Sequence, residues 1–185
     1  MAVDVEDNGQ QPPRLVELAV VPIDAGVIGD PVSWLVRPPS PITWQATKVH
    51  GITDQDVVEL PGIAAVEADI REYLDGAVLV AHNARIDIDV LARELPSWQP
   101  AAVIDTLRLA RARLPRQASY RLGVLVRTLR LDEDLPLGLR PRRAAYDALV
   151  AARLLVHLAA STGGDPPRLG DLVGAAPTSS PDQLF

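Results

Sequence analysis

The chain opens with two carboxylates that alternate with two valines. In Val3-Asp4-Val5-Glu6 the acids stand two positions apart, so on a β-strand both carboxylates project from the same face. Like charges on one face of a core strand repel each other and resist removal from water unless a cation lies between them. The pair therefore indicates half of a metal site. Acids of this kind are, however, more common on solvated chain ends.

Apolar periodicity predicts alternating strands and helices along the rest of the chain. The first three strands are joined by short connections, which is typical of an antiparallel meander. Pro38, Pro39 and Pro41 predict an extended loop that carries Trp44. The order of elements indicates an α/β fold with a mixed sheet flanked by helices. The expected strands cover residues 1–6, 15–23, 32–37, 77–81 and 101–104, and the expected helices cover a short stretch after Thr53 and residues 61–74, 84–95, 106–114, 120–131 and 143–160.

Length and composition set the domain organisation. The 185 residues, 48 % of them hydrophobic, suffice for one domain with a substantial core. Glycine, proline and serine dominate from Thr162 onward, and only residues 169–173 suit a turn of helix. We therefore expect one folded domain over residues 1–161 and a flexible tail over residues 162–185.

The charge is unevenly distributed. The net charge of −6 argues against a protein that coats nucleic acid generally. Residues 105–143, however, hold ten arginines and four acids, which suits binding of one polyanion at one place. Arginines on solvated helix faces would give the same count. The ten are Arg108, Arg111, Arg113, Arg116, Arg121, Arg127, Arg130, Arg140, Arg142 and Arg143.

The residue inventory excludes several classes of site. The chain has no cysteine, so a metal must be held by oxygen or imidazole, and a thiol nucleophile is excluded. No apolar run approaches the roughly 18 residues of a membrane span, and the N-terminus lacks the features of a signal peptide. We therefore expect a cytoplasmic protein with no membrane partner.

Two further acids stand where partners of Asp4 and Glu6 would have to come from. Asp87 follows the predicted strand 77–81, at the start of a helix, and Asp147 lies in the first turns of the last long helix. Each acid alone is explained by the helix dipole, which favours negative charge near a helix N-terminus. Considered as a set of four, the acids indicate a shared cation site.

Five stretches in order carry a resemblance to the DEDD superfamily of 3'-5' exonucleases, in particular to the DEDDh-like type that includes proofreading subunits and RNase T. Each match alone is weak, but five at family-like spacing over about residues 1–160 are specific. The stretches are residues 3–6 (Val-Asp-Val-Glu, followed by Gly9), 49–53 (Val-His-Gly-Ile-Thr), 82–87 (His-Asn-Ala-Arg-Ile-Asp), 104–107 (Ile-Asp-Thr-Leu) and 144–147 (Ala-Ala-Tyr-Asp).

The resemblance implies an RNase H-like fold and a phosphodiesterase that uses two metal ions. Asp4, Glu6, Asp87 and Asp147 would hold two Mg²⁺ or Mn²⁺ ions, which prefer oxygen ligands. Ions about 4 Å apart would activate water and stabilise the leaving 3'-oxygen. Such cations would also neutralise the cluster of acids.

The resemblance further implies a single-stranded DNA or RNA 3' end as substrate. Trp44 is open to two interpretations, stacking on a base or packing in the fold, and packing is the more common. Asn83 is also interpreted as a cap of the helix that carries Asp87. The candidate substrate-binding residues are Gln10, His50, Gly51, Ile52, Asn83 and Arg143.

The sequence departs from the family pattern at the general base. The family places a histidine five residues before the last aspartate, or a tyrosine four residues before it, and here these positions hold Arg142 and Arg143. Arginine stays protonated, so Arg142, which occupies the catalytic position, cannot accept a proton. A slow exonuclease in which Arg142 clamps phosphate, an inactive relative that binds nucleic-acid ends, and a substitution peculiar to this chain all fit.

The sequence says less about macromolecular partners than about the fold. Residues 182–185 (Asp-Gln-Leu-Phe) faintly resemble peptides that bind sliding clamps, although an apolar chain end is the simpler interpretation. The resemblance leaves a polymerase or clamp partner, a role in DNA repair and a homodimer open.

Overall fold

A five-stranded mixed sheet forms the centre of the molecule. The computed structural model describes residues 1–160 and 169–173. The strand order is β5-β2-β1-β6-β7; β1 pairs with β2, and β2 with β5, in antiparallel fashion, whereas β1 with β6 and β6 with β7 run parallel. The antiparallel meander, the parallel strands and the RNase H-like arrangement are thereby confirmed. The strands are β1 (Ala2–Asp7), β2 (Leu15–Val21), β5 (Val32–Leu35), β6 (Val78–Ala81) and β7 (Ala102–Asp105), with a separate hairpin of β3 (Ile23–Asp24) and β4 (Val27–Ile28).

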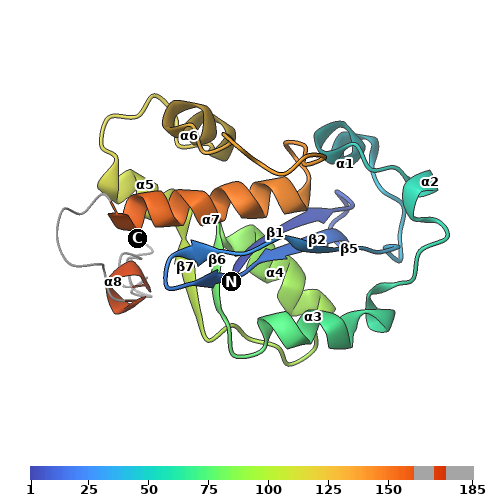
Figure 1. Ribbon diagram of the computed structural model, residues 1–185. Helices are drawn as coiled ribbons and strands as arrows, with labels where there is room; N and C mark the ends of the chain where they lie inside the picture. The colour runs from blue at the N-terminus through green and yellow to red at the C-terminus, as the bar shows by residue number, and fades with distance from the viewer. Residues whose placement is uncertain (161–168, 174–185) are drawn as a thin grey trace, which may run out of the picture.

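Helices cover both faces of this sheet (Figure 1). The long helix α7 packs against β1 and β2 on one face, and α4 contacts the same strands on the other. Every residue of β2 is buried because the strand is covered on both faces, which explains its nearly continuous apolar run. The helices are α1 (Trp44–His50), α2 (Asp54–Val57), α3 (Glu67–Leu74), α4 (Arg85–Glu94), α5 (Thr106–Arg113), α6 (Leu122–Leu129), α7 (Ala144–Ala160) and α8 (Leu169–Val173), with a 3-10 turn at Ile63–Ala65.

The alternation of β1 divides its side chains between two cores. Ala2 belongs to the apolar cluster formed with α5, α6 and α7, whereas Val3 belongs to the cluster formed with α3 and α4. Asp4 and Glu6 share the parity of Ala2, so they project toward the α7 face. The first strand is therefore central, and its acids lie beneath a helix rather than at a solvated chain end.

Three local predictions are corrected. Residues 44–50, expected in an extended loop, form α1 because the Thr43 side chain accepts a hydrogen bond from the Ala46 N–H and Gly51 ends the helix with a φ of 77°. The helix expected over residues 61–74 begins only at Glu67, after the 3-10 turn. The strand expected over residues 32–37 ends at Leu35.

Residues 161–168 and 174–185 lie outside the described residues. The predicted flexibility of most of the segment 162–185 and the clamp-like segment 182–185 therefore lie outside them too. The turn of helix expected at residues 169–173 is present as α8, which contacts β7. Over the described ranges, no helix combines the length and the apolar character that crossing a lipid bilayer requires.

Candidate active site

Three carboxylates from two elements meet on the α7 face of the sheet. Asp4 and Glu6 project from β1, and Asp147 projects from the first turn of α7. One carboxylate oxygen of each lies within 4.8 Å of the others. The structure thus brings together residues from the two ends of the folded domain, as the sequence predicts. A purely oxygen-based donor set of this kind fits Mg²⁺ or Mn²⁺.

Asp87 adjoins this group from α4. Its Oδ1 accepts a hydrogen bond from the backbone N–H of Val5 at 3.1 Å, and its side chain is buried. The strand β6 pairs with β1 only at Ala2, so no strand partner reaches the N–H of Val5 and the carboxylate takes that place. Asp87 is not among the three acids whose oxygens lie within 4.8 Å, but its charge is the largest electrostatic contribution to the raised pKa of Asp4.

Burial raises the pKa of all four acids, and repulsion from nearby carboxylates adds to it for Asp4, Glu6 and Asp87. Burial and then the nearby carboxylates raise the pKa of Asp4 well above its usual range and that of Glu6 to about 8. Burial is also the main cause that raises the pKa of Asp87 to about 7 and of Asp147 to about 6. Acids shifted in this way favour a compensating positive charge. The cluster is therefore electrostatically suited to a cation.

Arg143 and Glu17 fix the start of α7. Two guanidinium nitrogens of Arg143 donate to the carboxylate oxygens of Glu17 at 2.8 and 2.6 Å, and the Ala144 N–H donates to the same carboxylate at 3.1 Å. The guanidinium predicted to contact substrate is thus engaged within the protein. Sequence reasoning missed Glu17, although a single acid inside the apolar run of β2 was the available signal.

Arg142 lies beside Asp147 but is not paired with a carboxylate in the described part of the chain. Its side chain is exposed, its φ is 64°, and it lines a hollow of about 570 Å³ together with Tyr146 and Asp147. A backbone hydrogen bond from Arg142 and its positive charge both lower the pKa of Asp147, against the larger effect of burial.

None of the three histidines takes the place of a base beside Asp147. His50 is fixed by the Asp7 carbonyl and the Ile52 N–H, and His82 by Thr106 and the Tyr120 carbonyl. His157 lies about 15 Å further along α7 than Asp147. Burial lowers the pKa of both His50 and His82, which keeps the two imidazoles neutral.

The segment 50–53 is tied to the end of β1. The Nε2 of His50 lies 3.2 Å from the Asp7 carbonyl oxygen and its Nδ1 accepts from the Ile52 N–H at 3.0 Å. Both His50 and Ile52 are buried, whereas Gly51 is exposed at the end of α1. His50 therefore positions this segment, and the exposed backbone at Gly51 is the part that a ligand can reach.

Gln10 and Trp44 flank the same side of the site. The Gln10 side chain donates to the Pro41 carbonyl at 3.0 Å, so it holds the β1-β2 loop against the segment before α1. Trp44 is 65 % exposed, and the Lys48 ammonium lies 3.9 Å from the centre of its ring. The interpretation of Trp44 as a packing residue is therefore wrong.

Asn83 does not cap α4. The N-cap of that helix is Ala84 and carries no side-chain cap, whereas Asn83 adopts a φ of 69° and donates its backbone N–H to Asp105 at 3.1 Å. Asp105 in turn caps α5 through the N–H groups of Leu107 and Arg108. Sequence reasoning gave Asp105 no role beyond a motif match, and its position directly before a helix was the signal.

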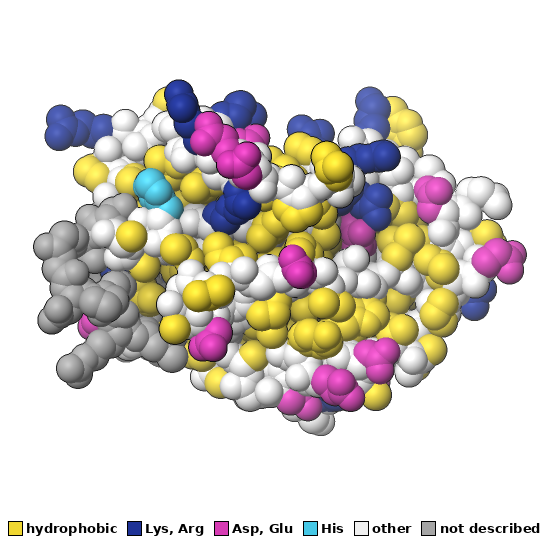
Figure 2. Space-filling view, in the orientation of Figure 1, with side chains coloured by type: hydrophobic (Ala, Val, Ile, Leu, Met, Phe, Trp, Pro, Cys, Tyr) yellow, Lys and Arg dark blue, Asp and Glu magenta, His cyan; other side chains and the backbone are white. Residues whose placement is uncertain are grey.

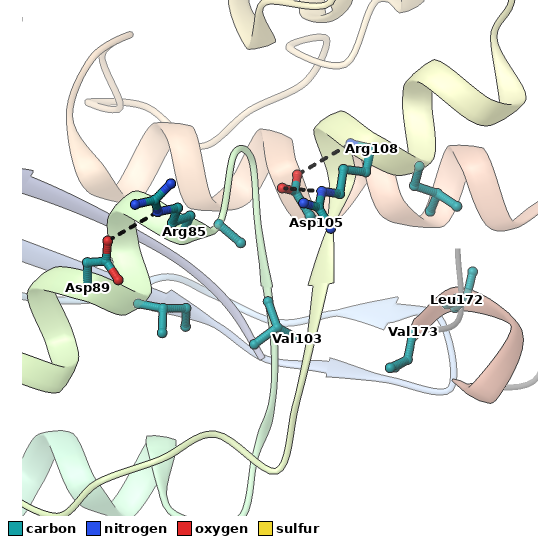
Figure 3. Close-up of a pocket in the computed structure, with 10 residues that line it drawn as sticks. Arg85, Asp89, Val103, Asp105, Arg108, Leu172 and Val173 are labelled. Carbon is teal, nitrogen blue, oxygen red and sulfur yellow. Dashed lines mark hydrogen bonds and ion pairs between the residues drawn. The ribbon is translucent and has the colours of Figure 1, made fainter. Parts of the chain in front are cut away.

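A second hollow, of about 340 Å³, lies between α4, β7 and α8 (Figure 3). Arg85 pairs with Asp89 and Arg108 with Asp105 along its rim, at 3.5 and 4.0 Å. None of Asp4, Glu6 and Asp147 lines this hollow. The candidate site is therefore the acidic group between β1 and α7.

The chain is similar to known exonucleases and to a DNA polymerase. The RNase_T family, described as an exonuclease family, matches residues 1–155. Exodeoxyribonuclease 10 of Escherichia coli (strain K12) is 36 % identical over 172 residues, which cover 93 % of this chain and 74 % of that protein. The PolC-type DNA polymerase III of Bacillus subtilis (strain 168) is 32 % identical over 162 residues, but these cover only 11 % of that much longer protein.

A solved structure is similar over nearly its whole length. Exonuclease X in complex with 5' overhanging duplex DNA has a TM-score of 0.77 and 34 % sequence identity, with 94 % of this chain and 97 % of that chain covered. The similarity includes the sheet and the helices that position the acids.

Proposed function

The chain belongs to the RNase_T family of exonucleases, with the fold of a DEDD-type 3'-5' exonuclease, and we propose that it removes nucleotides from the 3' ends of single-stranded nucleic acid with the help of divalent cations. The observation that carries the proposal is the meeting of Asp4, Glu6 and Asp147 within 4.8 Å. Asp87, buried beside Asp4, completes the set of four acids.

In this proposal Asp4, Glu6, Asp87 and Asp147 hold two Mg²⁺ or Mn²⁺ ions. When bound, such ions supply Lewis-acid stabilisation of the phosphate and lower the pKa of an attacking water. The donor set supports this assignment because it is made only of carboxylates and because the pKa values of all four acids are raised despite the nearby arginines.

The remaining residues position the acids and the substrate. The Arg143–Glu17 pair holds the first turn of α7, and with it Asp147, against β2. His50 holds Gly51 beside the end of β1, where the terminal nucleotide would lie. Arg142, exposed next to Asp147, would bind a phosphate oxygen, a task for which a guanidinium is well suited.

The absence of an imidazole beside Asp147 supports a second candidate function. Because Arg142 cannot accept a proton, the chain would bind nucleic-acid 3' ends and cut them slowly or not at all. A cytoplasmic location, a role in DNA repair and association with a polymerase are further parts of the proposal.

The test is digestion of single-stranded DNA and RNA labelled at the 5' end, with Mn²⁺ present. We expect stepwise shortening from the 3' end, and we expect Asp147→Asn to abolish it. Asp69→Asn, which removes an exposed carboxylate on α3, is the matched control and should retain full activity. Oligonucleotides that bind but stay intact would support the binding function instead. Oligonucleotides that neither bind nor shorten would contradict both.

A further inference from the structure

A continuous trough extends away from the acids along α6. The hollow of about 570 Å³ beside Asp147 is bounded by α6, the segment before α7 and the first turn of α7. A second hollow of about 490 Å³ is bounded by the end of β6, by α5 and by the start of α6. The two share Arg121 and Leu122, so they adjoin. The trough thus leads from the acids, past the N-terminal half of α6, to α5.

Four exposed arginines line the trough. Arg127 and Arg142 line its first part, Arg121 lines both parts, and Arg111 lines its far part. Within residues 1–160 and 169–173, none of these four guanidinium groups forms an ion pair with a carboxylate. The acids that line the trough are Asp132 and Asp147, and the second of these belongs to the metal group. The trough therefore presents an excess of positive charge.

Other arginines of the basic segment have partners within the protein. Arg143 pairs with Glu17, Arg130 with Glu133 and Arg108 with Asp105, and Arg113 donates to the Leu158 carbonyl. Arg116 and Arg140 line neither hollow. Most Lys and Arg side chains visible in Figure 2 lie on the upper side of the molecule, where α6 lies, whereas the lower margin is acidic. The local charge excess seen in the sequence is thus partly concentrated in the trough.

The floor of the trough suits a nucleotide chain. Leu122, Val124 and Val126 supply apolar surface, and the ring of Tyr120 lies 6.0 Å below the Arg111 guanidinium. The eight residues of α6 span about 12 Å. Successive phosphates of one strand advance by about 3.4 Å along the axis of a helical strand and by more in an extended one, so about two or three of them fit along this length.

We propose that this trough holds the sugar-phosphate backbone of the strand that precedes the scissile bond. The inference rests on the proposed function, because it takes the acids as the place where the 3'-terminal phosphodiester lies. The rest of the strand must then leave the acids along some surface. The trough begins at Asp147 and carries four guanidinium groups that form no ion pair with a carboxylate of the described residues, so it suits a polyanion. Recognition through phosphates predicts binding that depends on length and salt rather than on base sequence.

The test measures binding and cleavage separately. Binding of 5'-fluorescein oligo-dT is followed by fluorescence anisotropy over a salt series with a chelator present, for dinucleotides, tetranucleotides and dodecanucleotides. Cleavage of the dinucleotide is followed with Mn²⁺. The variants are Arg111→Ala and Arg121→Ala. The control is Arg93→Ala, which removes an exposed arginine at the far end of α4, outside both hollows.

We expect each trough variant to bind the dodecanucleotide about tenfold more weakly at low salt, with a much smaller loss for the dinucleotide. The slope of log K against log salt should become shallower by about 0.7 for each arginine removed. Arg93→Ala should change neither quantity. Equal losses for Arg93→Ala and the trough variants, or losses that do not grow with length, would overturn the proposal.

The binding arm does not depend on catalysis. If the parent protein leaves the 5'-labelled single-stranded DNA and RNA of the digestion test intact with Mn²⁺, the proposed exonuclease function fails, while the anisotropy data still decide whether the trough binds the strand. A length-dependent loss in the trough variants supports the trough in either case.

Discussion

A permanently charged guanidinium, that of Arg142, lies in the hollow beside Asp147. It lowers the pKa of Asp147 against the effect of burial, so it helps that acid to ionise at neutral pH. It cannot, however, remove a proton from water. At the scale of single residues, the candidate site has four carboxylates and an exposed guanidinium but no imidazole beside Asp147.

Arg142→His should therefore accelerate cleavage. A correctly placed general base typically contributes about 10²- to 10⁴-fold, and we expect a rise of this order in the rate of single-turnover cleavage with Mn²⁺. Arg142→Gln removes the charge without supplying a base, so it should weaken binding and leave the chemical step slow. Arg140→His adds an imidazole two positions earlier and serves as the control. A parent protein that already cuts as fast as Arg142→His would show that another group serves as base.

The sequence predicted the four acids of the candidate site, but it did not predict the residues that hold them in place. The alternation of Asp4 and Glu6 with valines indicates that both acids project from one face of a strand. Asp87 and Asp147 are indicated by motifs at family-like spacing. In the sequence, Glu17 is a single acid within an apolar strand. Only the fold shows that the Arg143 guanidinium donates a hydrogen bond to it from the start of α7. Such long-range pairs depend on tertiary geometry, which local patterns do not encode.

At the scale of elements, two Arg–Glu pairs fasten β2 to a helix on either face. Arg143 and Glu17 connect α7 with β2, while Arg14, just before β2, donates to Glu94 of α4 at 2.6 and 3.0 Å. Each glutamate is buried and also accepts a backbone N–H. The two pairs are chemically alike and each holds a helix that carries an acid of the proposed site. Arg143, however, directly precedes the first turn of α7, which carries Asp147, whereas Glu94 is the last residue of α4, at the opposite end from Asp87.

Arg143→Ala should destabilise the protein and also impair cleavage. Loss of one partner leaves the buried Glu17 carboxylate uncompensated, which costs roughly 2 kcal/mol once the partial exposure of Arg143 is taken into account. Arg14→Ala should cost a similar amount in urea unfolding but retain most of the cleavage rate of the folded protein. Equal losses of cleavage rate in the two variants would contradict the positioning role of Arg143.

Gly9→Ala tests the contact between the β1-β2 loop and α1. Gly9 has a φ of 70°, and an added Cβ would collide with the Thr43 side chain, the cap of α1. Strain and overpacking together should cost about 2 to 4 kcal/mol in urea unfolding. Gly26→Ala also places a side chain at positive φ, but nothing lies within 4 Å, so it should cost less. If Gly9→Ala and Gly26→Ala lower the free energy of unfolding equally, the Thr43 side chain moves away from the new methyl group without loss of stability.

The periodicity of apolar residues predicted most strands and helices, because each element must place apolar side chains on the face that it buries. The helix α1 was missed because three prolines dominated the interpretation of that stretch, although Thr43 is a standard helix N-cap residue. The left-handed backbone at Arg142 leaves no local signal in the sequence, whereas Asn83 is of a residue type that adopts this conformation readily. These positions lie in the loops next to the acids. The sequence therefore predicted the conformation of these loops less well than it predicted the strands and helices.

At the scale of the whole molecule, the acid cluster should make stability depend on pH and on cations. The folded state holds protons that the unfolded chain releases, since the pKa of Glu6 is raised to about 8 and that of Asp87 to about 7. This stabilisation is complete below about pH 4 and is lost as the pH rises through 7 and 8. The lowered pKa values of His50 and His82 act in the opposite sense, below about pH 6.5.

The Tm of the cation-free protein should therefore fall between pH 6.5 and about pH 8.5 when measured by differential scanning calorimetry. Mn²⁺ at one hundred times its Kd should raise Tm at the upper pH by roughly 5 to 10 °C. Asp147→Asn should reduce both effects, whereas Asp69→Asn should reduce neither. A Tm that is insensitive to Mn²⁺ at high pH would show that the acids do not hold the cation.

The place of β1 in the sheet has a consequence for synthesis on the ribosome. β1 pairs with β2, which follows it directly, but its other neighbours β6 and α7 emerge long after it does. The acids that meet in the finished protein are supplied by the first strand and by the last long helix. The cluster therefore cannot assemble until almost the whole domain has been translated. A nascent chain that ends before α7 lacks Asp147, so under the proposed function it should not cut nucleic acid until translation of the domain is nearly complete.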